Sequence, residues 1–357
     1  MKKILSVVLA LLISVSFLSA CMRQGEVSPS PLPYSSQTPG LTEKPAPTAE
    51  PTQVPYAFEI DYRKCPRLLE TELGSGIINL ARLTIDAFLS GEDSVVLPNL
   101  ESSGNISMLL YAISVMCPPF SAYTDANELK SYDVQTRTLS WKFYDGDGTR
   151  EEVLVGFENC IKEQYMSILS SNDTELMRAI LLYHAYTEDM AYDYDAFNMT
   201  EIDGTDPVMR IRLSGYNAIM GKSGICTGIS EGLCFLFIQA DINCCPINCF
   251  EGESGAHEWL MAEFGGKYYF CDPTWETNGG LKYFGLSADD RASWAGGYLE
   301  QNMLIFYKSI AGRYRADDSE RFSALRWIES TPDEIVREGT SILIKNNGVE
   351  PITIDCK

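Results

Sequence analysis

Three residues in the second half of the chain have side chains that could act together as a nucleophile, a proton carrier and an orienting acid. Cys226 follows a Gly-rich stretch, His257 comes 31 residues later, and Asp272 follows after another 15. A thiolate attacks carbonyl carbons, an imidazole exchanges protons near neutral pH, and a carboxylate holds an imidazole in one orientation. The set therefore fits acyl transfer through a thioester.

A helix is expected to begin at Cys226. Residues 221–246 are a Gly-rich loop followed by an apolar stripe at helical spacing, which includes Ile225, Ile229, Leu233 and Ala240. The N–H groups of a first turn and the positive end of the helix dipole favour a thiolate over a thiol. The position therefore suits an activated nucleophile.

A β-hairpin is expected to bring the imidazole and the carboxylate together. If Phe264 pairs with Lys267 across a two-residue Gly-Gly turn, His257 lies opposite Thr274 and Asp272 lies one diagonal step away on the same face. A register slip that makes His257 and Asp272 directly opposite leaves them on that face. The prediction of a relay of Cys226, His257 and Asp272 therefore does not depend on the choice of loop.

Three motifs, in this order, resemble the transglutaminase-like superfamily of papain-type fold. They are GICTG at 224–228, AHEW at 256–259 and YFCDPTW at 269–275, and the resemblance covers roughly residues 170–290. It implies an α+β fold in which a nucleophile-bearing helix packs on an antiparallel sheet. It also implies that Cys226, His257 and Asp272 are the catalytic triad.

The chain departs from this pattern around the motifs. Ile229 stands where an aromatic residue is common, and Glu258 and Leu260 stand where the family usually has Ala and Asn. The resemblance therefore does not define the contacts to substrate. For the oxyanion hole, the backbone N–H of Cys226 is one expected donor. Tyr216 is a candidate side-chain donor, and the alternative is a buried aromatic residue in the 211–220 segment.

Two other features resemble functional sites but have simpler interpretations. Asp145, Asp147 and Thr149 are spaced like the start of a calcium loop, but the glycine and the glutamate that complete such a loop are missing, so a hairpin turn is favoured. His184 continues the apolar stripe of a helix expected to follow Asn172 and to run to about 191. It is therefore interpreted as a hydrogen-bonded core histidine.

The chain has eleven cysteines. Cys244, Cys245 and Cys249 could be metal ligands together with His257, but their spacing matches no common zinc motif and the imidazole would be lost to the relay. We expect no metal and no cofactor. The remaining cysteines are interpreted as a mixture of buried thiols and one or two disulfides.

The N-terminus has the pattern of an export signal. Residues 1–20 hold two lysines followed by an uncharged apolar stretch that ends LSA before Cys21, which resembles a bacterial lipoprotein box. This predicts lipidation at Cys21 and an extracytoplasmic, lipid-anchored protein. The alternatives are an uncleaved membrane anchor and a simple secretory peptide. Residues 21–57, rich in Pro, Ser and Thr, are expected to be a linker.

The remaining chain is divided by pattern into 58–171, an N-terminal α+β region, 172–290, the catalytic domain, and 291–357, an extension packed on the core. Further expected elements are helices at 77–89, 106–116 and 331–338, a strand at 132–144, and a hairpin of 341–344 with 352–355. The formal charge of −21 repels phosphate backbones, so nucleic acid is not an expected partner.

These observations predict a surface-anchored cysteine peptidase or amidase. Its expected substrates are peptide or protein amides, with cell-wall peptides among the candidates. Three alternatives stay open: an amine-transferring transglutaminase, a catalytically silent module that binds peptide or glycan, and a structural or adhesive lipoprotein. Hydrolysis is favoured over transfer to amines by analogy with bacterial relatives of the resembled family.

Overall fold

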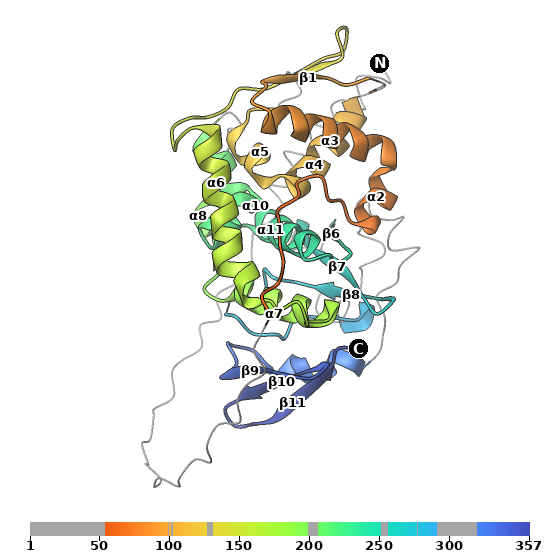
Figure 1. Ribbon diagram of the computed structural model, residues 1–357, viewed down its shortest axis with the longest axis vertical. Helices are drawn as coiled ribbons and strands as arrows, with labels where there is room; N and C mark the ends of the chain where they lie inside the picture. Colours follow the sequence, from red (N-terminus) through yellow and green to blue (C-terminus); the bar gives the residue numbers. More distant parts are fainter. Residues whose placement is uncertain are drawn as a thin grey trace.

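An antiparallel sheet and one long helix stand at the centre of the molecule (Figure 1). The sheet has the strand order β6-β7-β8, formed by Cys244–Phe250, Ala256–Phe264 and Lys267–Cys271. Helix α11, Cys226–Gln239, packs against β6 and β7. Phe264 pairs with Lys267 across the turn, so the predicted hairpin register is confirmed.

The computed structural model describes residues 54–98, 100, 103–126, 131–198, 206–250, 256–276, 278–290 and 320–357. Over these residues the fold is mixed α+β with antiparallel sheets, as predicted. The signal, Cys21 and almost all of the linker lie outside the described residues, as does the first part of the C-terminal extension. No helix within the described ranges is long and apolar enough to cross a bilayer.

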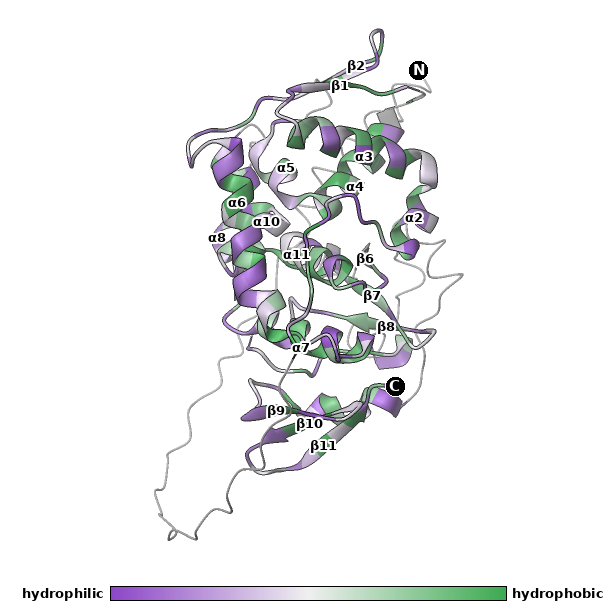
Figure 2. Cartoon of the chain, viewed as in Figure 1, coloured by the Kyte–Doolittle hydropathy of each residue, from purple (hydrophilic) through white to green (hydrophobic). Residues whose placement is uncertain are grey.

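Most helices of the N-terminal half lie above α11 in Figure 1, and the last of them lies beside it. Its elements are α2 (Arg67–Leu73), α3 (Ser75–Leu89), α4 (Ser103–Met116), α5 (Pro118–Tyr123) and α6 (Arg150–Cys160). The predicted helices at 77–89 and 106–116 are confirmed as α3 and α4. Figure 2 shows hydrophobic residues along α4 and long hydrophilic stretches along α6, as their interior and outer positions require.

The predicted strand at 132–144 is wrong. It consists of two short strands, β2 (Tyr132–Asp133) and β3 (Thr138–Ser140), with β1 (Ser94–Val96) on the other side of β3. The carboxylate of Asp133 accepts backbone N–H bonds from Gln135 and Thr136, and Arg137 adopts φ 55°. An Asp-initiated turn therefore interrupts the alternating pattern.

Helix α7, Glu175–Thr187, follows the π-helical turn η2 (Ile161–Tyr165) and the 3-10 turn η3 (Met166–Ile168). The helix that we expected directly after Asn172 begins two residues later, because its N-cap is Thr174, whose hydroxyl accepts the N–H of Met177. The helix also ends at Thr187, before the predicted end near 191. Residues of the predicted tail form a separate strand.

That strand, β4 (Ala191–Tyr192), pairs in parallel with β5 (Ser223–Gly224), which leads directly into α11. The described part of the chain between them, 193–198 and 206–222, contains three short helices: α8 (Tyr194–Phe197), α9 (Pro207–Leu213) and α10 (Gly215–Met220). This pairing fixes the chain immediately before Cys226.

The C-terminal part has a 3-10 helix, η5 (Glu320–Trp327), and a sheet of order β11-β10-β9. The predicted hairpin is confirmed by β10 (Ser341–Asn346) and β11 (Val349–Asp355), in which Ile344 pairs with Ile352. The predicted helix at 331–338 is wrong, because β9 (Glu334–Glu338) pairs with β10 through Ile335 and Ile344. Residues 331–338 could form a helix or a strand, and pairing with the edge of β10 favours the strand.

One continuous hydrophobic core runs through both halves of the molecule, from Tyr62 to Cys356. It includes residues of α3 and α4, of α7 and α11, and of the central sheet. The boundary expected near residue 171 is therefore bridged by shared packing, whereas the division into functional domains stays a prediction.

Candidate active site

Cys226 is the first residue of α11, as the sequence predicted. The preceding residue, Ile225, has extended backbone angles (φ −97°, ψ 175°) and makes no side-chain cap. The first-turn N–H groups are therefore not satisfied by a capping side chain, and their partial positive charge lies beside the sulfur. This is the environment that stabilises a thiolate and a developing oxyanion.

Glycines of the GICTGISEG segment allow neighbouring backbone to approach α11 closely. A Cβ added at Gly228 would lie 2.7 Å from the carbonyl oxygen of Leu213, and one at Gly232 would lie 2.4 Å from the hydroxyl of Tyr186. A Cβ added at Gly215 on α10 would lie 2.9 Å from the backbone nitrogen of Gly232. The glycines therefore allow α11 to lie close to α7, to the end of α9 and to the start of α10.

His257 and Asp272 are joined by a hydrogen bond. Nε2 of His257 lies 2.8 Å from Oδ2 of Asp272, and the side chains are 11% and 0% exposed. The strand ladder ends at the pair Leu260 and Cys271, so Asp272 is the first residue beyond β8. The predicted pairing of imidazole and carboxylate is therefore present in the structure.

The backbone around Asp272 holds its carboxylate in place. Oδ1 accepts the N–H groups of Thr274 and Trp275, each at 3.2 Å. The N–H of Asp272 donates to the carbonyl of Tyr283 at 3.0 Å. Both oxygens of this buried group thus accept hydrogen bonds, and one of them is aimed at the imidazole.

Cys226 reaches the same imidazole. Its thiol is within hydrogen-bonding reach of the His257 ring. Because Asp272 engages Nε2, Nδ1 is the ring nitrogen left to face the sulfur. Burial lowers the pKa of His257, but Asp272 and Cys226 raise it by more than burial lowers it. The net effect is a pKa of about 10. The ring is therefore protonated at neutral pH.

Two tryptophans stack on the His257 ring. The Trp275 ring lies 5.2 Å away at an angle of 9°, and the Trp259 ring lies 5.9 Å away at 26°. Indole faces attract a protonated imidazole and limit its rotation. The sequence analysis gave neither tryptophan a role. Their positions at the ends of the AHEW and DPTW motifs were the signal that could have indicated stacking on His257.

Tyr183 and Glu276 support the Asp272 loop from behind, and sequence reasoning did not find them. The Tyr183 hydroxyl donates to the carbonyl of Asp272 at 3.0 Å and lies 3.3 Å from Oε2 of Glu276. Burial raises the pKa of Glu276 to about 8, and its Oε2 faces the Tyr183 hydroxyl and accepts the backbone N–H of Tyr283. Tyr183 is 89 positions from Asp272, and nothing in the pattern joins them.

Tyr216 lies in an aromatic cluster. Its ring stacks on Phe157 at 5.2 Å and meets Tyr123 edge to face at 5.0 Å. These contacts fit the alternative of a buried aromatic residue. Its role as an oxyanion donor stays a prediction.

His184 is hydrogen-bonded within the fold, as predicted. Its Nδ1 lies 2.8 Å from the carbonyl oxygen of Gly279. The resembled calcium loop also has structural partners: Asp147 accepts from the Tyr123 hydroxyl, and Thr149 caps α6 in a box with Glu152. Residues 145–148 therefore lead into a helix and are not the hairpin turn that we expected.

The cysteines that the structure describes, apart from Cys249, whose side chain lies outside the description, are nine free thiols. The one or two expected disulfides are not found among them. Within the same residues, no three His, Cys, Asp or Glu side chains are grouped as a metal site. His257 is turned to Asp272 and Cys226.

A cavity of about 590 Å³ lies at the other end of the hairpin. Its walls include Lys64, Arg67 and Glu263, together with the Gly-Gly turn. Arg67 pairs with Glu263, and Lys64 pairs with Asp241 at 2.8 Å. None of Cys226, His257 and Asp272 lines this cavity, so it is separate from the candidate site.

Comparisons with known proteins give distant structural likeness only. No protein-family model and no curated protein matches the chain. A putative cysteine protease from Cytophaga hutchinsonii is 13% identical over 34% of this chain and 37% of its own, with a TM-score of 0.25. A transglutaminase structure ("TGase") is 13% identical over 38% and 40%, with a TM-score of 0.28. The chain thus matches well under half the length of both, and any functional argument rests on the site geometry.

Proposed function

We propose that this protein is a cysteine-dependent hydrolase of amide bonds in peptides or proteins. The observation that carries the proposal is the linked set of Cys226 at a helix start, His257 within its reach, and Asp272 hydrogen-bonded to the imidazole at 2.8 Å. The three side chains come from α11, β7 and the end of β8. In space, the imidazole lies between the sulfur and the carboxylate, as a nucleophile, a proton carrier and an orienting acid require.

In the proposed reaction the thiolate of Cys226 attacks the carbonyl carbon of the scissile amide. The negative charge that develops on the carbonyl oxygen is stabilised by the N–H of Cys226 at the start of α11. His257 donates its proton to the departing amine, which leaves a thioester on Cys226. His257 then takes a proton from water, which attacks the thioester and releases a carboxylic acid and the thiol.

An amine could resolve the same thioester in place of water, which would make the protein an acyltransferase. Cys226 is only 7% exposed, so the access of the second reactant decides the outcome. We propose hydrolysis. Release of free acid from a peptide amide, without incorporation of a labelled primary amine added in excess, is the expected result.

The nucleophile can be tested with a matched cysteine. Cys226→Ala should abolish peptide cleavage and keep a cooperative unfolding transition, whereas Cys160→Ala, at a cysteine of similar exposure (8% against 7%), should keep the cleavage. Peptide mapping after limited alkylation should find Cys226 labelled first. Cleavage that persists in Cys226→Ala would contradict the proposal. Absence of cleavage and of selective labelling, with retained peptide binding, would favour the silent module.

The cellular setting is a second part of the proposal and rests on residues 1–57 alone. We propose that Cys21 carries a lipid that holds the enzyme outside the cytoplasm, where wall peptides and extracellular proteins are accessible substrates. Labelling of expressing bacteria with a fatty-acid probe should mark the wild-type chain and not the Cys21→Ser chain. An unlabelled wild-type chain would overturn the anchor and leave the catalytic proposal untouched.

A further inference from the structure

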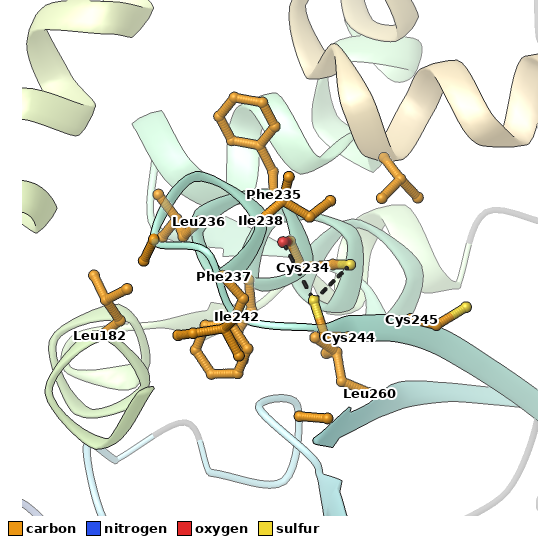
Figure 3. Close-up of a cluster of buried hydrophobic side chains, with 14 of the residues drawn as sticks. Leu182, Cys234, Phe235, Leu236, Phe237, Ile238, Ile242, Cys244, Cys245 and Leu260 are labelled. Carbon is orange, nitrogen blue, oxygen red and sulfur yellow. Dashed lines mark hydrogen bonds between the residues drawn. The ribbon is translucent and has the colours of Figure 1, made fainter. Parts of the chain in front are cut away.

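Two buried cysteines meet between the nucleophile-bearing helix and the central sheet. Cys234 lies on α11, Cys244 begins β6, and their Sγ atoms are 3.4 Å apart. Both side chains are fully buried. Figure 3 shows the two sulfurs facing each other while Cys245, the next residue along β6, points away.

The two sulfurs need only a small movement to form a covalent bond. A disulfide has a sulfur–sulfur distance of about 2.05 Å, so the two atoms need to approach by roughly 1.4 Å. The surroundings are apolar side chains, among them Phe237, Ile242 and Leu260. Among the described residues, the other side-chain hydrogen bond of the two thiols runs from Cys244 to the carbonyl oxygen of Cys234 at 3.7 Å. Forming the bond would therefore break no strong polar contact.

We propose that Cys234 and Cys244 form a disulfide when the chain folds in the presence of a disulfide oxidant such as oxidised glutathione. One cysteine sulfur attacks the oxidant and releases one reduced glutathione, giving a mixed disulfide. The second cysteine sulfur attacks that mixed disulfide and releases the other. Two electrons pass from the cysteine sulfurs to the glutathione sulfurs, and the two protons end on the released thiols.

We expect the disulfide to form while the chain folds and not in the folded protein. Both thiols are closed off from solvent, and burial raises the pKa of Cys234 well above that of an ordinary thiol. The folded dithiol is therefore a poor nucleophile with no access for glutathione. Once formed, the bond is protected from reductants by the same burial.

The bond would tie the helix that carries Cys226 to the strand beside the one that carries His257. It encloses a short loop, residues 234–244, and so restricts the unfolded chain. Neither cysteine touches the candidate triad in the contacts described above. Formation of this disulfide is therefore independent of the proposed catalysis.

The test is oxidative refolding of the whole chain followed by mapping. Protein unfolded in denaturant with reductant is refolded in a glutathione redox buffer, and remaining thiols are blocked with N-ethylmaleimide. Cleavage after Glu231, Asp241 and Glu251 separates Cys234 from Cys244. The expected product is peptide 232–241 joined to 242–251 and absent after reduction. Its mass is the sum of the two free thiol peptides, less two hydrogens for the disulfide, plus two maleimide labels on Cys245 and Cys249.

Single variants identify the partner within peptide 242–251, which also holds Cys245 and Cys249. The crosslink should persist in Cys245→Ala and disappear in Cys244→Ala. The crosslinked wild type should melt higher than its reduced form, on the order of 5 °C. Cys234 recovered with the maleimide label after refolding, or a crosslink that survives in Cys244→Ala, would overturn the proposal. Equal melting temperatures of the crosslinked and reduced forms would show that the bond does not stabilise the fold.

Discussion

At the scale of single residues, His257 is the group whose surroundings determine the chemistry. It lies between Cys226 and Asp272, with Trp275 stacked on its ring at 5.2 Å. Burial alone would remove its proton, but the neighbouring acid and sulfur outweigh that effect and bring its pKa to about 10. The site therefore keeps the imidazole protonated at neutral pH.

This arrangement predicts the pH dependence of thiol reactivity. In the wild type Cys226 should react with iodoacetamide at pH 6, because the protonated His257 ring lies within hydrogen-bonding reach of its sulfur. In His257→Gln the rate at pH 6 should fall by roughly tenfold or more and should recover only as ordinary thiols ionise, near pH 8.5. Stopped alkylation with peptide mapping measures both rates. His184→Gln is the matched control, and an equal loss there would show that the effect is structural.

At the scale of elements, close approach of helices positions the nucleophile. Gly228→Ala would place a Cβ 2.7 Å from the Leu213 carbonyl, which belongs to rigid backbone. We expect destabilisation of about 1–3 kcal/mol, because α11 must move away from its neighbour. Urea unfolding measures the loss, and the alkylation rate of Cys226 should fall with it.

Gly156→Ala on α6 is the comparison for that substitution. A Cβ at Gly156 meets nothing within 4 Å. This change should leave stability unchanged or raise it by about 0.5–1 kcal/mol, the ordinary helix preference for Ala over Gly. If both variants lost the same stability, the close approach at Gly228 would not be the cause.

At the scale of the whole molecule, the C-terminal sheet is joined to the segment before α7 by an ion pair whose carboxylate is buried. Arg337 on β9 contacts Asp173 through Nε at 2.6 Å and Nη2 at 2.9 Å, and the Asp173 side chain is 1% exposed. Arg337→Ala leaves that carboxylate buried without its cation and should cost on the order of 3 kcal/mol. Lys345→Ala removes an exposed pair with Glu334 and should change stability by about 0.5 kcal/mol or less. Urea unfolding of both variants compares the two pairs; equal losses would contradict the argument.

The buried titratable groups also predict how the stability of the whole molecule depends on pH. The folded pKa of Glu276 is raised from 4.5 to about 8 and that of His257 from 6.5 to about 10. A raised folded pKa means that the folded state holds the proton more tightly, so its stabilisation is complete below the unfolded value and is lost as pH rises through the folded value. The melting temperature should therefore fall between pH 5 and pH 10.

Glu276→Gln separates the two contributions. The amide keeps the size of the side chain but does not ionise, so the part of the decline that ends near pH 8 should shrink and the part that ends near pH 10 should remain. Thermal unfolding followed by circular dichroism from pH 5 to pH 10 measures both curves. A wild-type melting temperature that rises over this range would contradict the assignment.

The sequence by itself determined the local frame of the site. The apolar stripe and the Gly-rich loop placed Cys226 at the first residue of a helix, and a Gly-Gly turn with alternating strands placed Phe264 opposite Lys267. Both signals are local, since helix starts and hairpin registers depend on residues a few positions apart. The same local reasoning failed at 331–338, where pairing with β10 decided the conformation.

Only the tertiary structure decided what surrounds that frame. Tyr183 reaches the Asp272 loop from 89 positions away, and Cys234 on the helix meets Cys244 on the sheet. Tyr216, a candidate for the site, is packed against Phe157. Each of these contacts depends on how helices and strands pack across the core. Such packing is set by shape and burial over the whole molecule, and no periodic pattern in the sequence records it.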